Sequence, residues 1–315
     1  MKYLLYTFSL ALMFQGCGDS TKKTPSTSDV NGTSSVGSFI DLPLNPTFSR
    51  VDSDIVKENR SNLYWQDNDA AKTTIKTLPA ATSYCAGLTL SGLTEWRLPT
   101  YKELMTLVTY DREKPAIYDT FVYTAKEEYW SSTTSARSVG TSGTSKSWAI
   151  DFDLGSTRVD FFNGFTTSNK YVRCVNDSLS NKRVADVNFT RESNIVTDNI
   201  HNLEWQDEVG TKVNLYDFSE AQSYCSALTL DTKTGWRVPT IKELLSIQDV
   251  TDFDASTHND FLYTAYNKPY RSSKERVGDT YGWTLTFADG KISYSGQTDS
   301  STIFDYYVRC VRDKN

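Results

Sequence analysis

The chain has 315 residues, a formal net charge of -6 and a sequence pI of about 5.1. This length allows two domains of ordinary size, and the 19 Tyr and 7 Trp provide material for dense cores. The acidic balance excludes a broad nucleic-acid-binding surface, which needs clustered Lys and Arg. No apolar run after the N-terminus approaches the roughly 18 residues that span a bilayer.

The N-terminus is typical of an export signal. Lys2 supplies a positive start, and residues 3–14 are mostly apolar but too short for a stable span. The sequence FQGC that ends at Cys17 resembles a bacterial lipobox, which predicts a signal peptide over residues 1–16 and lipidation of Cys17. Plain secretion with a stray cysteine is the alternative. Gly18 after the cysteine favours the outer membrane or the cell surface.

Residues 17–46 are rich in Ser, Thr, Lys, Gly and Asp and have little apolar content. A segment of this composition cannot bury a core, so it predicts a flexible tether between the membrane anchor and the rest of the chain.

The remainder of the chain is an internal repeat. Several motifs recur at an offset of 140, and the last one recurs at an offset of 136. The paired motifs are Asn62 to Asp67 with Asn202 to Asp207, Ser83-Tyr84-Cys85 with Ser223-Tyr224-Cys225, Trp96 to Thr100 with Trp236 to Thr240, and Val172 to Val175 with Val308 to Val311. We therefore predict two domains, over residues 47–177 and 185–315, with separate cores.

The cysteines agree with export. Once Cys17 is assigned to a lipid, each repeat keeps one early and one late cysteine. The economical pairing is Cys85 with Cys174 and Cys225 with Cys310, because crossed pairs would require two similar units to exchange partners. Disulfides persist in the oxidising compartments that exported proteins reach.

Each repeat is predicted to be α+β, with two helices followed by a small antiparallel sheet. Ala81 and Cys85 share a helical face, and Gly87 marks the end of that helix. Thr100 with Glu103, and Thr240 with Glu243, fit capping boxes that begin a second helix. Residues 147–152 and 283–287 are typical of strands, Asp289-Gly290 indicates a hairpin turn, and residues 170–175 predict one closing strand.

Together these motifs, with Tyr129-Trp130-Ser131-Ser132, resemble the Lcl C-terminal domain family over most of the chain after the tether. The resemblance implies a fold similar to C-type lectin-like domains and a role in extracellular binding, with sulfated glycans as a suggested ligand. Two departures limit it. The chain has no collagen-like Gly-X-Y stalk, and Arg271 replaces Trp130 in the second repeat.

The sequence predicts a protein without enzymatic activity. Its only histidines, His201 and His258, lie in no hydrolase motif, and the cysteines are assigned to lipid and bridges. Arg97 and Arg237, in the Trp-Arg motif, are interpreted as holding carbonyls or a carboxylate rather than a ligand. Arg173 and Arg309 are interpreted in the same way.

Two kinds of binding site are candidates. Ca²⁺ is a possible cofactor. It prefers hard oxygen ligands, and the acidic residues that could supply them are Asp67, Asp69, Asp207 and Glu208. Solvated acidic loops are the alternative. A ligand such as a sulfate or a uronic acid could bind basic and aromatic side chains, for which the candidates are Trp130, Lys268, Arg271, Lys274 and Arg276. A core position for Trp130 and an exposed, charge-balanced loop are the alternatives.

The favoured hypothesis is a lipid-anchored, adhesin-like envelope protein that binds a glycan or another envelope or host surface component. One alternative is a structural envelope lipoprotein with a protein partner. A less favoured alternative is a relative of formylglycine-generating enzymes, whose chemistry requires a reactive cysteine pair.

Overall fold

The computed structural model describes residues 42–134, 147–158, 168–177, 187–250, 257–278, 282–295 and 305–314. The predicted signal peptide, Cys17 and nearly all of the predicted tether lie outside these ranges. Residues 37–315 form one compact unit that contains both repeats. Within the described ranges, no helix is both long and apolar enough to cross a membrane.

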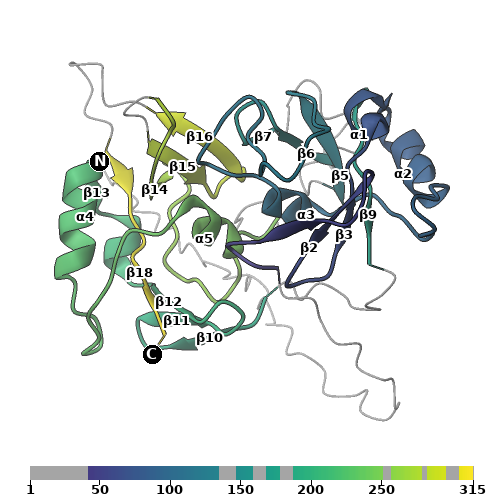
Figure 1. Ribbon diagram of the computed structural model, residues 1–315. Helices are drawn as coiled ribbons and strands as arrows, with labels where there is room; N and C mark the ends of the chain where they lie inside the picture. The colour runs from purple at the N-terminus through teal and green to yellow at the C-terminus, as the bar shows by residue number, and fades with distance from the viewer. Residues whose placement is uncertain are drawn as a thin grey trace, which may run out of the picture. The chain divides into compact units, whose positions relative to one another are not determined.

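The first repeat has two sheets and three short helices (Figure 1). A four-stranded sheet has the order β1-β2-β3-β9, and a five-stranded sheet has the order β4-β8-β5-β6-β7, in which β5 and β8 are parallel. The strands are β1 (Phe48–Arg50), β2 (Ile55–Glu58), β3 (Tyr64–Gln66), β4 (Ile75–Lys76), β5 (Glu128–Thr134), β6 (Ser147–Asp151), β7 (Ser156–Arg158), β8 (Lys170–Tyr171) and β9 (Val175–Asn176). The helices are α1 (Asp69–Thr73), α2 (Leu78–Ala86) and α3 (Tyr101–Thr106).

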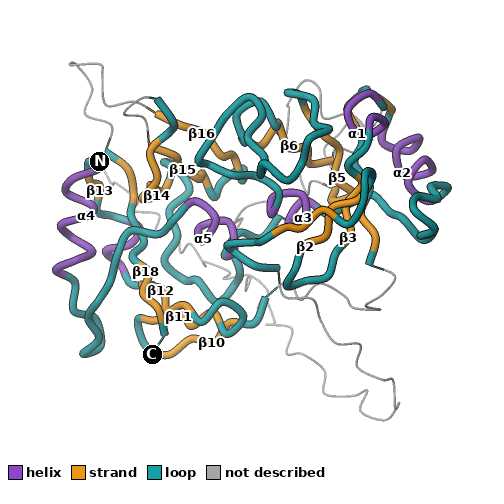
Figure 2. The backbone as a smooth tube through the Cα atoms, viewed as in Figure 1, coloured by secondary structure: helices purple, strands orange, loops and turns teal. Residues whose placement is uncertain are grey.

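The second repeat has the same topology, with sheet orders β10-β11-β12-β18 and β13-β17-β14-β15-β16. Its strands are β10 (Phe189–Glu192), β11 (Ile195–Asp198), β12 (Leu203–Gln206), β13 (Leu215–Tyr216), β14 (Tyr270–Glu275), β15 (Gly282–Thr286), β16 (Lys291–Ser295), β17 (Tyr306–Tyr307) and β18 (Val311–Asp313). Its helices are the 3-10 turn η2 (Val209–Lys212), α4 (Phe218–Ala227) and α5 (Ile241–Ser246). Figure 2 shows that long loops connect these short elements.

The helix predictions are confirmed, with one addition. Both predicted capping boxes are present: the Thr100 hydroxyl accepts from the Glu103 N–H and the Glu103 carboxylate accepts from the Thr100 N–H, and α5 repeats the arrangement. Gly87 follows the last residue of α2 as its C-cap. Each repeat also has one short helical element that was not predicted. It is α1 in the first repeat and η2 in the second, and it precedes the two predicted helices.

The predicted single closing strand at residues 170–175 is wrong. The segment divides into β8, which joins the five-stranded sheet, and β9, which joins the four-stranded sheet. Cys174 lies in the extended link between them, where its N–H donates to the Gln66 carboxamide at 3.2 Å. The link therefore connects the two sheets of the repeat at the position of the disulfide.

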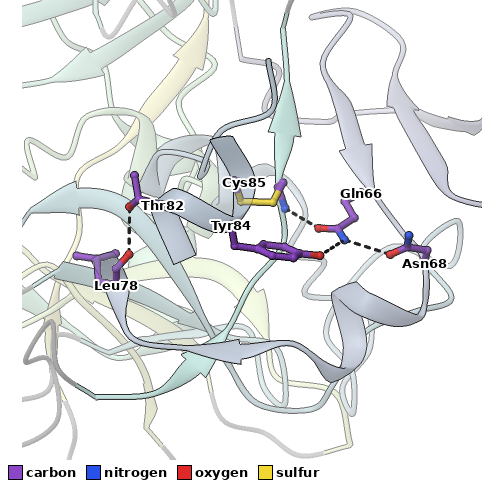
Figure 3. The surroundings of a disulfide bond; sticks show 7 residues. Gln66, Asn68, Leu78, Thr82, Tyr84 and Cys85 are labelled. Carbon is purple, nitrogen blue, oxygen red and sulfur yellow. Dashed lines mark hydrogen bonds between the residues drawn. A yellow bond between two sulfur atoms is a disulfide. The ribbon is translucent and has the colours of Figure 1, made fainter. Parts of the chain in front are cut away.

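Both predicted disulfides are present, Cys85–Cys174 and Cys225–Cys310. Figure 3 shows the first one, which joins α2 to the link between β8 and β9. The Gln66 amide nitrogen donates to the Tyr84 hydroxyl and to the Asn68 side chain, each at 3.1 Å. Gln66 thus fixes β3 against both partners of the bridge.

The prediction of separate cores is wrong. One cluster of buried apolar side chains includes residues from both repeats, and only two smaller clusters, around the disulfides, belong to one repeat each. Trp283 packs edge-on against Tyr110 with ring centroids 4.9 Å apart. Its equivalent, Trp148, lies so close to Gly290 that a Cβ there would overlap the indole. The two repeats therefore bury equivalent tryptophans in each other's loops.

Candidate functional site

A fully buried aspartate organises each repeat. Asp67 follows β3, and its carboxylate accepts a hydrogen bond from Arg173 at 3.0 Å and pairs with Arg50. Asp207 accepts from Arg309 at 2.6 Å and pairs with Arg191. Two guanidinium groups per carboxylate compensate the cost of burying it. In the second repeat, burial opposes ionisation, but the attraction of Arg309 and the hydrogen bonds prevail and lower the pKa of Asp207 below its usual value.

The same carboxylates fix one loop in each repeat. Asp67 accepts from the backbone N–H groups of Val122 and Tyr123 at 3.0 and 3.1 Å. Arg173 completes the clamp from the other side, because it donates to the Tyr123 carbonyl at 2.7 Å. In the second repeat, Asp207 accepts from the corresponding N–H groups at 2.8 and 3.1 Å, and Arg309 donates to the corresponding carbonyl at 2.8 Å. Both loops are therefore held by charge-assisted hydrogen bonds on two sides.

The fixed loops present an apolar side chain to solvent. Val122 is 61% exposed, and so is its equivalent Leu262. The neighbouring tyrosines, Tyr123 and Tyr263, are half-buried. An exposed lysine stands at the same position of α1 and η2 in both repeats, and in the second repeat its ammonium lies 5.1 Å from the Tyr263 ring centre. We call these groups of residues the display faces. They are Lys212, Leu262 and Tyr263 in the second repeat and the residues at the equivalent positions of the first repeat, Lys72, Val122 and Tyr123.

The second repeat exposes further apolar side chains along η2 and shortly after Tyr263. Val209 and Val213 in and beside η2 are 53% and 56% exposed, and Tyr266 is 38% exposed. The first repeat has Asp69, Thr73 and Lys126 at the equivalent positions. The two repeats thus share a framework but differ in the side chains around it.

The predicted calcium site is not supported. Asp67 and Asp207 each face two arginines, which repel a cation. Glu208 accepts from the Gln206 amide at 2.8 Å, and Asp69 lies in the exposed first turn of α1. Among the described residues, no three Asp, Glu, His or Cys side chains come together as a metal site.

The prediction of Trp130 as a ligand contact is wrong. Its side chain is fully buried, and the indole N–H donates to the Lys76 carbonyl at 2.9 Å. The ammonium of Lys170 lies 5.1 Å from the ring centre. Trp130 fills the core between α2 and the five-stranded sheet. A core position was the alternative to a ligand contact.

The predicted basic patch does not form one surface. Arg271 is 1% exposed and packs on the rings of Phe218 and Tyr306. Lys274 and Arg276 form ion pairs with acidic residues of the first repeat, Asp111 at 2.5 Å and Glu113 at 2.6 Å. Lys268 is exposed. Three of the four cations therefore stabilise the protein itself.

The interpretation of the Trp-Arg motif is confirmed. Arg97 binds both oxygens of Glu103, at 2.8 and 2.6 Å, and Arg237 binds Glu243 in the same way. Each glutamate belongs to a capping box, so the arginine fixes the start of α3 or α5. These arginines hold the helix rather than a ligand.

The histidines have structural contacts. His201 Nδ1 lies 2.7 Å from the Asp198 carboxylate and Nε2 lies 3.1 Å from the Leu42 carbonyl oxygen. His258 lies 3.8 Å from Asp249 and packs against Phe189.

Sequence reasoning missed the display faces, although a signal was present. Residues 121–125, FVYTA, recur as residues 261–265, FLYTA, at the same offset of 140. A motif kept in both repeats that includes an exposed aliphatic residue points to a surface function. Its link to Asp67 and Asp207, 55 residues away in each repeat, is visible only in the folded chain.

These features define a class of protein: a tandem of small α+β domains, each with one disulfide and one clamped surface loop. Residues 54–176 and 194–312 each match the Lcl C-terminal domain, and together they make up most of the chain. The protein therefore belongs to the Lcl C-terminal domain family. No curated protein matches the chain.

Proposed function

We propose that this protein is a cell-envelope lipoprotein that binds glycans through its display faces, and that each repeat has a C-type lectin-like fold. The observation that carries the proposal is the exposed aliphatic residue and half-buried tyrosine that both repeats keep on a loop clamped by a buried carboxylate. An exposed lysine stands at the same position of α1 and η2. A clamped loop loses little conformational entropy on binding, so its contacts contribute more of their energy to affinity.

The chemistry of the display faces suits an acidic sugar. The apolar faces of sugar rings pack against aliphatic and tyrosine side chains, and a lysine ammonium pairs with a carboxylate or sulfate. In the second repeat Lys212 and Arg191 both lie within 6 Å of the Tyr263 ring centre. Arg191 is paired with Asp207, so Lys212 is the cation that can offer its charge to a ligand beside the ring.

The glycan proposal is tested on an array of neutral, uronic and sulfated glycans with the full chain. Leu262→Ser and Lys212→Ala change exposed side chains, and we expect each to weaken binding to the selected glycan about tenfold or more. Val277→Ser is the matched control, because Val277 is 46% exposed and lies outside both display faces. Binding to no glycan, or equal binding by all variants, contradicts the proposal.

A protein partner is the second candidate. The exposed aliphatic residues Val209, Val213 and Leu262 favour it, since exposed apolar side chains contribute to protein contacts. Under this alternative, we expect the wild type to be cross-linked to envelope proteins. The Leu262→Ser variant should lose these cross-linked partners, and an excess of free glycan present during cross-linking should not prevent them from forming.

The envelope location rests on the export signal, on Cys17 and on the two disulfides, which suit an oxidising compartment. Intact-mass analysis with non-reducing peptide mapping tests it. We expect a chain that begins at Cys17 and carries acyl groups. An unmodified Cys17 in an otherwise intact cytosolic chain contradicts it. The non-enzymatic assignment is part of the same proposal, because the described cysteines are all in bridges and offer no reactive thiol pair.

A further inference from the structure

A pocket lies between α3 of the first repeat and α5 of the second. Equivalent positions of the two helices line it in pairs: Lys102 with Lys242, Met105 with Leu245, and Thr106 with Ser246. The segment Leu42 to Leu44 and residues Ile200 and His201 complete the wall. Its volume is about 70 Å³, and its mouth is open to solvent. The pocket exists only because the two repeats pack together, and it is distinct from the display faces.

The charge of the lining has one sign. Three basic residues, Lys102, His201 and Lys242, line the pocket, and no acidic residue does, although the whole chain carries a net charge of -6. Two acids contact or attract these basic residues. Asp198 contacts His201, and Asp111 attracts Lys242 and pairs with Lys274. A concentration of positive charge in a partly apolar pocket attracts an anion.

Lys242 lines the pocket, and the contacts of its ammonium are known. It donates to the Tyr118 hydroxyl at 3.1 Å and lies 4.9 Å from the ring centre. Burial lowers the pKa of Lys242 to about 7, against the attraction of Asp111. An anion beside this nitrogen would favour its charged form.

We infer that this pocket binds a small monoanion, a carboxylate that carries a short apolar body. Both ring nitrogens of His201 already contact oxygen atoms, so the lysines supply the donors, which suits a single carboxylate better than a doubly charged phosphate. The side chains of Leu42, Leu44, Met105 and Leu245 suit an alkyl chain. This inference does not depend on the glycan proposal, because the display faces contribute no residue to the pocket.

The test is isothermal titration calorimetry of the full chain with hexanoate, hexanol, hexylamine and glucuronate. We expect hexanoate to bind. Hexanol should bind at least about tenfold more weakly because it lacks the charge, and hexylamine should not bind. Tighter binding of glucuronate than of hexanoate overturns the apolar part of the inference. Equal binding of hexanol and hexanoate overturns the anionic part.

Lys242→Met and Lys102→Met each remove one positive charge from the pocket and so test its role in binding. Each variant is expected to weaken hexanoate binding about tenfold, whereas Lys268→Met, which changes an exposed lysine elsewhere, leaves it unchanged. Lys242→Met removes a desolvated charge, so its melting temperature should equal or exceed that of the wild type, which separates lost binding from lost folding. In the wild type, hexanoate affinity should fall as the pH rises above 7, and in Lys242→Met this fall should be smaller. Undiminished binding by both pocket variants overturns the inference.

Discussion

The guanidinium of Arg271 lies 5.0 Å from the ring centre of Tyr306, and the first repeat has the same pair with cation and ring exchanged, as Trp130 and Lys170 at 5.1 Å. Arg271 replaces Trp130, and Tyr306 replaces Lys170. The substitution that distinguishes the two repeats is thus compensated on the neighbouring strand. The cation and the ring form a favourable pair in either arrangement.

This exchange predicts coupling between the two positions. Arg271→Trp should lower the free energy of unfolding by about 1–3 kcal/mol, because it places two bulky rings in a packed site and removes the cation. Adding Tyr306→Lys should recover about 1 kcal/mol, measured by urea denaturation as a double-mutant cycle. The reverse cycle, Trp130→Arg with Lys170→Tyr, is the matched control in the first repeat. Simple additivity in both cycles would contradict the compensation.

The buried Asp207 predicts a pH dependence of stability. Because its folded-state pKa is lowered, ionised Asp207 contributes stability at pH values above its unfolded pKa, and this contribution is lost as the pH falls through the folded pKa. The free energy of unfolding should therefore fall below about pH 4. Thermal unfolding between pH 2 and pH 7 measures it.

Asp207→Asn should lower the stability at neutral pH by about 3–5 kcal/mol, since it leaves Arg309 and Arg191 without their anion. The acid-dependent loss should then become smaller. Asp69→Asn, at an exposed position, is the control and should change both quantities little. An unchanged pH profile in Asp207→Asn would mean that other carboxylates dominate the acid transition.

The ion pair between Arg276 and Glu113 predicts that the repeats are coupled by charge. Both side chains are largely buried, with 18% and 14% exposure. Arg276→Glu should cost about 1.5–3 kcal/mol, the range of a charged hydrogen bond, and adding Glu113→Arg should restore much of it. The same exchange at Lys274 and Asp111, which are 42% and 79% exposed, should cost less than about 1 kcal/mol. Equal costs at the two pairs would contradict this ranking.

The shared core predicts a single unfolding transition for both repeats. Calorimetry of the full chain should yield one cooperative peak, because the buried apolar cluster contains residues of both repeats. Replacing Cys225 and Cys310 by Ala should lower the stability of the whole by about 4–5 kcal/mol in the chain-entropy model. Two separate peaks, of which only one moves in this variant, would show that the repeats unfold independently.

The sequence by itself determined the features that are local or repeated. The capping boxes at Thr100 and Thr240 need only four consecutive residues, and the structure confirms both. The disulfide pairing followed from one early and one late cysteine in each repeat, and both bridges are present. The repeat itself could be read directly, and the match of both copies to one family agrees with it.

Only the tertiary structure decided what the buried and the contacting charges do. Asp67 looked like a calcium ligand, but its partner Arg173 is 106 positions away in the chain. Lys274 and Arg276 looked like a ligand-binding patch, but their acidic partners lie 163 positions away in the other repeat. Sequence patterns report periodicity and neighbours within a few residues, whereas the environment that sets the role of a charge is assembled from distant segments.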